Sequence, residues 1–279
     1  MSTPVALVLG GHGLLGQPLA QQLAGNGWEA QSLDFEDCNL LNPVELQPRI
    51  EFINPDVIFN TVSWNTENPA EKQPQEALSV NRGLPAFLGG LVKGTSRFLV
   101  HYSSDQVFNG RKDSPYTEED KCGKSRLAGE QALLELNADN ICIIRTGWLF
   151  GPDGDSFLKR LLGRAKTEGT VEVIHDQIGS PTYAKDLAQA TLQLVKLRAP
   201  GLYHVANSGQ ATWCELAAEA VRQASLPCSV RAVASSDKTL RANYEVLSSA
   251  KYTALTGCPM RPWSQALREY IYSVLLASQ

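Results

Sequence analysis

The sequence is poor in the patterns that mark metal sites, disulfide scaffolds and nucleic-acid-binding proteins. Its 279 residues contain six cysteines and four histidines, with no C-x-x-C pair and no histidine nearby at zinc-ligand spacing. It has no run of lysine and arginine, and 25 basic side chains against 29 acidic ones give a net charge of −4. These absences argue against a structural zinc site and against nucleic acid as a partner.

Long apolar segments are also missing. No stretch approaches the roughly 18 apolar residues of a membrane span, and the N-terminal MSTPVALVLGG lacks the basic start and long apolar core of a secretion signal. We therefore expect a cytoplasmic protein with no membrane partner. A chain of this length buries about 75% of its unfolded surface without disulfides, so we expect most of the cysteines to be reduced and buried.

Short apolar runs alternate with helix-length amphipathic stretches over roughly the first two hundred residues. This order is typical of a parallel sheet covered by helices. We expect a doubly wound α/β domain in residues 1–150 and a smaller substrate-binding lobe in residues 151–279, and we leave open whether the chain crosses back to the first domain. The predicted strands are 5–9, 28–33, 57–60, 98–102, 141–145 and 202–205. The predicted helices are 14–23, 44–52, 77–92, 124–136, 155–166, 185–197, 213–224 and 263–276.

The first predicted strand runs into a glycine-rich turn at the start of a helix. The turn reads Gly10-Gly11-His12-Gly13-Leu14-Leu15-Gly16. Glycine permits the tight turn and the close approach of the backbone, and unpaired amides at a helix N-terminus bind a diphosphate. The turn therefore predicts a dinucleotide site on a Rossmann-like sheet. We expect its contacts to be Gly10, Gly13, Leu14, Leu15 and Gly16, and we interpret His12 as a backbone spacer.

Asp34 ends the second predicted strand, 18 residues after Gly16. A carboxylate at this place accepts hydrogen bonds from the hydroxyls of the adenine-side ribose. Because a carboxylate also repels a 2′-phosphate, we expect NAD(H) in preference to NADP(H). The alternative is that Asp34 is an ordinary solvated turn residue, and Glu36 and Asp37 compete for the assignment.

Five further sequence blocks occur in order along the chain. They are HYSSDQVFNG (101–110), PYTEED (115–120), GKSRLAGE (123–130), RTGWLFG (145–151) and DQIGSPTYAKDLA (176–188). With the glycine turn, they resemble the extended short-chain dehydrogenase/reductases, and within them the dTDP-4-dehydrorhamnose reductases, over nearly the whole chain. The resemblance implies an oxidoreductase that passes hydride from a nicotinamide to the 4-keto carbon of a nucleotide sugar.

The resemblance also assigns the catalytic positions. Ser104 matches the serine or threonine that helps to hold the keto oxygen. The family's Tyr-x-x-x-Lys pair, which protonates that oxygen and binds the nicotinamide ribose, falls on Cys122 and Arg126. A cysteine sulfur stands closer to the backbone than a phenol oxygen does, and a guanidinium differs from an ammonium in shape. The pattern therefore leaves catalytic competence open.

Three interpretations of these replacements stay open. In the first, the protein is a reductase whose acid is a water held by Cys122, or Tyr116 brought inward by a shortened loop. In the second, it is a non-catalytic NAD(P)- or nucleotide-sugar-binding regulatory protein, comparable to the regulatory subunit of methionine adenosyltransferase, which is similar to this family. In the third, Cys122 is a nucleophile or redox sensor beside Lys121 and Lys124. A homodimer or a protein partner is compatible with each.

The resemblance assigns further residues to the two ligands. In the segment from 60 to 64, Asn60, Val62 and Trp64 match cofactor positions, although a tryptophan after a buried strand is also typical of plain core. The residues that match the sugar site are Asp105, Trp148, Gln177, Ser180 and Arg241.

The segment from 241 to 247 departs from the family, because Glu245 replaces its serine and Ala242 its proline. A carboxylate beside a diphosphate would repel it unless Arg241 neutralises the charge or the side chain points away. Arg145, at a strand end, is expected to have a structural role.

Overall fold

The central element of the fold is a parallel sheet built from the short apolar runs of the sequence. The computed structural model describes residues 3–64, 74–110, 112–117, 125–235 and 243–276. In that part of the chain the strands of the main sheet lie in the order β10-β5-β4-β3-β1-β2, and every adjacent pair is parallel. The strands are β1 (Val5–Leu9), β2 (Glu29–Leu33), β3 (Val57–Asn60), β4 (Phe98–Ser104), β5 (Ile141–Thr146) and β10 (Gly201–His204).

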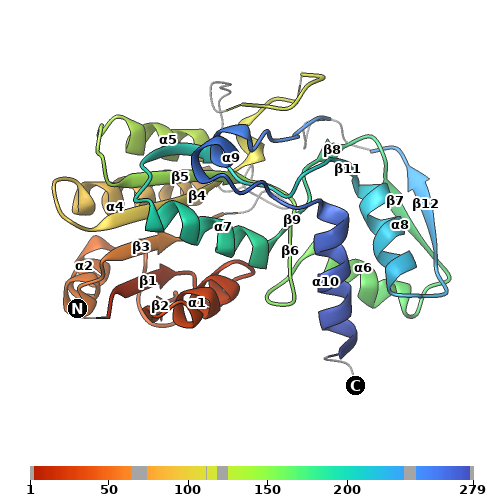
Figure 1. The fold of residues 1–279 in the computed structure, drawn as a ribbon, viewed down its shortest axis with the longest axis horizontal. Coiled ribbons are helices and arrows are strands. Elements are labelled where there is room, and N and C mark those ends of the chain that lie inside the picture. The colour runs from red at the N-terminus through yellow and green to blue at the C-terminus, as the bar shows by residue number, and fades with distance from the viewer. Residues whose placement is uncertain (1–2, 65–73, 111, 118–124, 236–242, 277–279) are drawn as a thin grey trace.

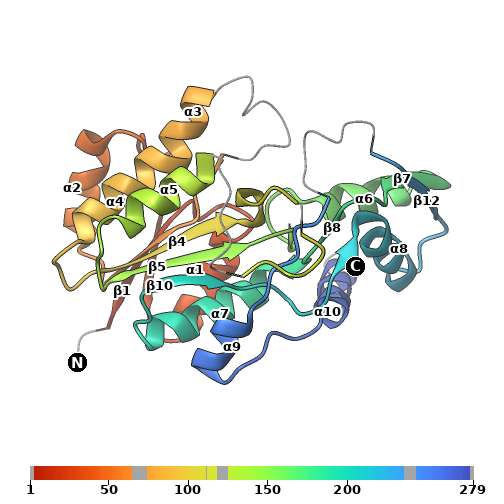
Figure 2. The ribbon, with the colours of Figure 1, turned by 90° about the horizontal axis from the view of Figure 1, so that it is seen from above.

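Helices cover both faces of this sheet (Figures 1 and 2). Successive strand residues point to opposite faces, so Val8 packs with α1, α7 and α9 while Leu7 and Leu9 pack with α2, α4 and α5. This burial on both faces explains why β1, β3 and β5 are continuous apolar runs. The helices are α1 (Gly16–Gly25), α2 (Pro43–Ile53), α4 (Leu84–Val92), α5 (Ser125–Leu134), α7 (Ala184–Lys196) and α9 (Ala250–Thr256).

The helix predicted over 77–92 is continuous but not uniform. It consists of α3 (Pro74–Leu78), a π-helical turn at Ser79–Gly83 and α4. A π-helical turn carries one extra residue within a helical turn, which rotates the side chains that follow it, and such turns occur often at functional sites. Here the turn contains Asn81, a buried residue whose side chain reaches the segment after β3.

The second lobe has a core of its own beside the carboxyl ends of the sheet strands (Figure 2). In it α8 and α6 pack against the parallel pair β7–β12, and α10 packs against α8. The pairs β6–β9 and β8–β11 carry the blocks RTGWLFG and DQIGSPTY. The lobe's elements are β6 (Leu149–Phe150), α6 (Phe157–Ala165), β7 (Thr170–Ile174), β8 (Ile178–Gly179), β9 (Thr182–Tyr183), β11 (Ala211–Thr212), α8 (Trp213–Gln223), β12 (Ser229–Val233) and α10 (Trp263–Leu276).

The chain after residue 150 does not stay in the second lobe. Helix α7 packs on α1, and β10 adds the outer strand beside β5. Helix α9 then covers β10. The two parts of the molecule are therefore connected by several chain crossings. None of the helices in the described ranges is long and apolar enough to cross a membrane.

Candidate functional site

The strand order reverses beside β1, and the glycine turn lies at this point. β2 pairs with one edge of β1 and β3 with the other. In open α/β sheets, ligands bind in the crevice that such a reversal leaves at the carboxyl ends of the strands. Gly10, which follows β1, has φ +83° and donates from its amide to Leu33 O at 2.9 Å. A Cβ on Gly10 would lie 2.7 Å from Thr61 Oγ1, so the turn fits closely against the end of β3.

The rest of the turn needs glycine for the same steric reason. Gly13 N donates to Gly10 O at 3.1 Å, and a Cβ on Gly16 would lie only 2.0 Å from Gly10 O. Leu15 is buried, and Leu14 contacts the backbone of Gly154 in the second lobe. Helix α1 begins here with no capping side chain and no acidic residue in its first turn. Gln17 N already donates to Gly13 O at 3.2 Å and Pro18 has no N–H, so the amides left for an anion such as a diphosphate are those of residues 14–16.

Asp34 lies against this turn from the end of β2. Its Oδ1 accepts a hydrogen bond from His12 N at 3.4 Å, and its Oδ2 lies 3.3 Å from His12 Nδ1. Asp37 contacts Asp34 itself in the turn that follows β2, where its Oδ2 accepts from Asp34 N at 2.8 Å. Of the three neighbouring acids, Asp34 is the one whose side chain contacts the glycine turn. The contact with the His12 imidazole was missed, because the sequence indicated only a spacer.

The segment after β3 is organised by two buried amides. Asn60 Oδ1 accepts from Val62 N at 3.2 Å, and its Nδ2 lies 3.1 Å from His101 Nδ1. Asn81, in the π-helical turn, accepts from Trp64 N at 2.9 Å and donates to Trp64 O at 3.3 Å. Asn60 and Asn81 thereby fix the backbone that runs past the mouth of the crevice. Asn81 was missed by the sequence analysis, and no local pattern marks it.

Arg126, the residue at the family's lysine position, is buried on α5. Its Nη2 donates to Trp64 O at 3.4 Å. Burial lowers the pKa of the Arg126 guanidinium, while the charges of Asp105 and Glu130 oppose that shift. Burial, together with the charge of Arg126, lowers the pKa of His101 to about 3. His101 is therefore neutral and Arg126 supplies the positive charge at this end of β4.

The structure describes Ser104 and Tyr116 among the other candidate catalytic residues, but not Cys122. Ser104, at the end of β4, accepts a hydrogen bond from Gln106 N at 3.1 Å and so caps a short 3-10 turn (Asp105–Val107). Cys122 lies outside the described residues, as do Lys121 and Lys124. Tyr116 is buried and stacks on Phe108 with ring centroids 4.0 Å apart, and its hydroxyl lies 3.4 Å from Asn109 Oδ1. This packing gives Tyr116 a structural role.

An ion pair between Arg145 and Glu130 lies behind the catalytic positions. Arg145 Nη2 lies 2.7 Å from Glu130 Oε2, and Glu130 Oε1 also accepts from Ser103. The two side chains are 2% and 0% exposed. Arg145 Nη1 also lies 3.3 Å from His204 Nε2 on β10, and His204 Nδ1 lies 3.1 Å from Tyr116 O. As expected, Arg145 is structural: it connects α5, β4, β5 and β10.

Trp148 lies at the junction of the two lobes in a constrained conformation. Its backbone has φ +47°, and its ring stacks on Trp213 at 3.6 Å with the planes 6° apart. A Cβ on Gly179 would lie 2.2 Å from Trp148 Cε2, so β8 packs flat on the indole. The Nε1 atom of Trp148 is buried and makes no hydrogen bond to the residues that the structure describes. A buried donor of this kind is suited to a polar ligand.

The remaining sugar-site candidates are buried around the same junction. Gln177 is 4% exposed, and its Oε1 has no hydrogen-bond partner within the described ranges. Ser180 Oγ accepts from Leu247 N at 3.1 Å, which holds the segment containing Glu245 against β8. The Asp105 carboxylate packs against Gly147, where a Cβ would lie 1.8 Å from its Oδ2. Arg241 lies outside the described residues.

Glu245 does not point into solvent. It is 2% exposed, and its backbone N donates to Ile178 O at 2.8 Å. Burial excludes a carboxylate directed into solvent. Neutralisation by Arg241 and a side chain directed away from the diphosphate both stay predictions.

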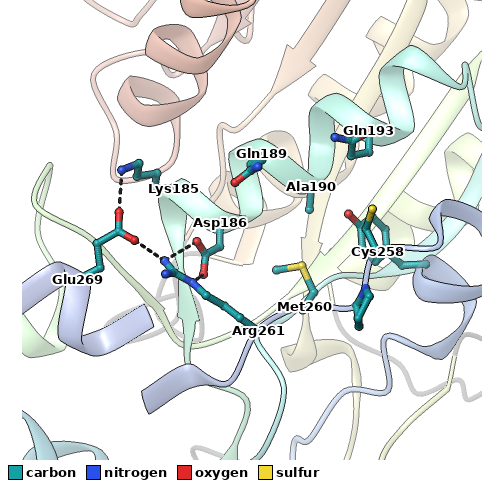
Figure 3. A pocket seen from close by; sticks show the side chains of 11 residues that line it. Lys185, Asp186, Gln189, Ala190, Gln193, Cys258, Met260, Arg261 and Glu269 are labelled. Carbon is teal, nitrogen blue, oxygen red and sulfur yellow. Dashed lines mark hydrogen bonds and ion pairs between the residues drawn. The ribbon is translucent and has the colours of Figure 1, made fainter. Parts of the chain in front are cut away.

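A separate cavity of about 380 Å³ lies between α7 and the segment 258–261 that precedes α10 (Figure 3). None of the predicted site residues lines it. Its charged side chains are paired with one another: Lys185 with Glu269 at 2.6 Å, and Arg261 with Asp186 at 2.7 Å and with Glu269 at 2.8 Å. These pairs hold the C-terminal helix to α7, and the cavity adds nothing to the crevice beside β1.

Comparison with known proteins identifies the family of this chain. The family model described as the RmlD substrate binding domain matches residues 5–276. The spore coat polysaccharide biosynthesis protein SpsK of Bacillus subtilis is 35% identical over 95% of this chain and 96% of its own length. A dTDP-4-keto-6-deoxy-D-glucose reductase of Streptomyces niveus is 33% identical over 94% and 95%.

A solved structure of the same family has the same fold as this chain. The crystal structure of dTDP-4-dehydrorhamnose reductase from Bacillus anthracis, in complex with NADP, is similar with a TM-score of 0.92 and 26% identity. The match covers 98% of this chain and all of the other. The chain therefore belongs to the RmlD substrate-binding family and is a relative of the dTDP-4-dehydrorhamnose reductases, with their Rossmann-like fold.

Proposed function

We propose that this chain binds a nicotinamide dinucleotide at the β1 turn and a dTDP-linked 4-keto sugar at the junction of the lobes, and reduces that sugar slowly. The observation that carries the proposal is the glycine turn at the strand-order reversal, where Gly10 and Gly16 leave no room for a side chain and α1 begins uncapped. Residues 1–150 supply the dinucleotide site, and the sugar site combines Asp105 and Trp148 of that range with later residues.

NAD(H) is the preferred coenzyme in this proposal. The Asp34 carboxylate lies beside the glycine turn, and its Oδ2 is buried with no hydrogen bond from the part of the chain that the structure describes. A ribose that carries both hydroxyls would donate to this carboxylate, whereas a 2′-phosphate would face its charge. The neighbouring Asp37, whose Oδ2 accepts from Asp34 N, adds a second negative charge beside Asp34.

Each catalytic position has a defined part in the proposed reaction. The bound nicotinamide supplies the hydride. Ser104 donates a hydrogen bond to the keto oxygen, and Arg126 places a permanent positive charge near the reacting end of β4. Cys122 holds a water that passes the proton, since a thiol sulfur reaches less far than a phenol. Loss of a directly placed general acid typically costs about 10² to 10⁴ in rate, so slow turnover is expected.

Sugar recognition is proposed for Trp148 and Gln177, which present a buried donor and a buried acceptor that no described residue satisfies. Two further residues complete the proposed sugar site. They are Asp105, which packs beside Gly147, and Ser180, which holds the segment that contains Glu245. Arg241 is proposed to meet the diphosphate. Binding without chemistry is the second candidate function, and the burial of Arg126 against Trp64 O favours it, because this guanidinium already has a protein partner.

One experiment separates the two candidates. NADH oxidation is followed by absorbance with a dTDP-4-keto-6-deoxy sugar, using the unaltered protein and the Cys122→Tyr, Arg126→Lys double variant. Slow turnover by the unaltered protein and faster turnover by the double variant supports the reductase. Turnover by the double variant alone supports binding without chemistry. Absence of dinucleotide binding by calorimetry would overturn both.

A further inference from the structure

Thr146, the last residue of β5, carries a buried hydroxyl for which the described residues offer no hydrogen bond. The residue is only 4% exposed. A buried hydroxyl without a partner loses its bonds to water and gains none in return, so such groups are rare inside proteins unless a ligand or a water meets them. The carboxyl end of a strand is also where an open α/β sheet binds its ligands. The Thr146 hydroxyl is therefore a candidate ligand contact.

Thr146 lies beside Ser104, the residue proposed to hold the keto oxygen. The two are paired in the register of the parallel strands β4 and β5. Every second residue of a strand points to the same face of the sheet. Thr146 follows Cys142 and Ile144 on one such face and Ser104 follows Tyr102, and these three side chains pack in the core that α1 shares. Both hydroxyl residues therefore lie on the α1 side of the sheet, on neighbouring strands.

The chain that follows Thr146 returns to the glycine turn. Gly151 and Gly154 both contact Leu14, since an added Cβ on either glycine would lie 3.3 Å from a side-chain carbon of Leu14. The segment 146–154 therefore runs from the end of β5 to the start of α1. It joins the Thr146 hydroxyl to the place of the amides that are proposed to hold the diphosphate.

The order of the strands gives the direction of the proposed dinucleotide. Asp34, which is assigned to the adenosine ribose, follows β2, on one side of β1. Strands β3, β4 and β5 follow one another on the other side of β1. With the diphosphate held at the start of α1, the nicotinamide half extends away from β2, over the ends of β3 and β4. Ser104 and Thr146 lie at the end of this path.

We propose that the Thr146 hydroxyl makes a hydrogen bond to the carboxamide of the nicotinamide and so fixes the rotation of that ring in the crevice. The inference rests on the proposed dinucleotide site. A carboxamide offers a carbonyl acceptor and an NH₂ donor, and a threonine hydroxyl can pair with either. Ser104 Oγ already accepts from Gln106 N, so its proton is the one left for the keto oxygen. Thr146 then binds the coenzyme, while its neighbour Ser104 serves the substrate.

The test compares the binding of two ligands by calorimetry. NADH contains the nicotinamide, whereas ADP-ribose has the same adenosine, diphosphate and second ribose without it. In Thr146→Val, which keeps the shape of the side chain and removes the hydroxyl, NADH affinity should fall about tenfold while ADP-ribose affinity is unchanged. A loss confined to NADH lies in the nicotinamide, whose polar substituent is the carboxamide. Circular dichroism establishes that the variant is folded, and Thr146→Ala, which also lacks the hydroxyl, takes its place if it is not.

Two further variants isolate the hydroxyl. Thr146→Ser keeps a hydroxyl and should bind NADH as the unaltered protein does. Thr191→Val removes the hydroxyl of another buried threonine, on α7, which accepts a hydrogen bond from Tyr102 OH at 2.9 Å. Thr191→Val should bind both ligands normally, so it controls for the loss of any buried hydroxyl.

Three outcomes would overturn the inference. One is a Thr146→Val protein that binds NADH as tightly as the unaltered protein does. Another is a loss of ADP-ribose affinity equal to that of NADH, which would assign the effect to the crevice as a whole. The third is Thr146→Ser binding NADH as weakly as Thr146→Val does. In each case the proposed function stands as long as the unaltered protein binds both ligands; if it binds neither, the dinucleotide site is wrong and the inference falls with it.

Discussion

The crevice beside β1 and the catalytic end of β4 have diverged to different extents. Beside β1, each glycine that the turn requires is present, and added side chains at Gly10 or Gly16 would collide with neighbouring atoms. At the candidate catalytic positions, the resemblance places Cys122 and Arg126 where the family has a tyrosine and a lysine. A site that binds by backbone amides tolerates little change, whereas chemistry can be lost while the fold persists. The two regions therefore call for separate tests of binding and of turnover.

The largest effect is expected from the buried pair that supports the catalytic end. Glu130→Ala leaves the Arg145 charge buried without its carboxylate, which should lower the free energy of unfolding by about 3–5 kcal/mol. Urea unfolding followed by circular dichroism measures this. Glu168→Ala, at the exposed pair with Arg164, is the control and should leave the unfolding midpoint nearly unchanged. If Glu130→Ala and Glu168→Ala lower the free energy of unfolding equally, the buried ion pair does not stabilise the fold more than an exposed pair does.

The next effect concerns the crevice alone. Gly16→Ala places a Cβ 2.0 Å from Gly10 O, a backbone atom that can move only if the turn opens. We expect NADH affinity to fall by about 100-fold or more, measured by calorimetry after a check that the variant is folded. Gly25→Ala, in the same helix with nothing within 4 Å of the added Cβ, is the matched control and should bind normally. If Gly16→Ala binds NADH with normal affinity, the diphosphate does not bind at this turn.

The smallest effect separates the sugar site from the dinucleotide site. Gly179→Ala pushes on the Trp148 indole, which Trp213 backs from the other side. We expect binding of a dTDP-sugar to weaken about tenfold while NADH binding is unchanged. Gly163→Ala on α6, where the added Cβ meets nothing within 4 Å, is its control. Loss of NADH binding in Gly179→Ala would show that the two regions are not separable.

The sequence predicted the strands of the sheet well, because apolar runs between turn residues are local signals. β1 and β3 have the predicted limits, Val5–Leu9 and Val57–Asn60. The π-helical turn was not predicted, because it depends on the contact between Asn81 and the segment of Trp64. A uniform helical pattern carries no sign of that contact.

The candidate site was predicted less completely, for a similar reason. The glycine turn and Asp34 follow from spacing along the chain, and they do lie together. The approach of His12 to Asp34 joins the ends of two different strands, and the packing of Tyr116 on Phe108 depends on the folded cluster around it. Contacts of this kind come from tertiary structure, so spacing alone could not predict them.

The most direct test of the central claim is amide hydrogen exchange of the unaltered protein with and without NADH. If main-chain amides at the start of α1 hold the diphosphate, NADH should slow exchange in the peptide covering residues 10–16, and in the peptide that contains Asp34. Saturating NADH that protects other segments, with residues 10–16 exchanging as fast as before, would contradict the account.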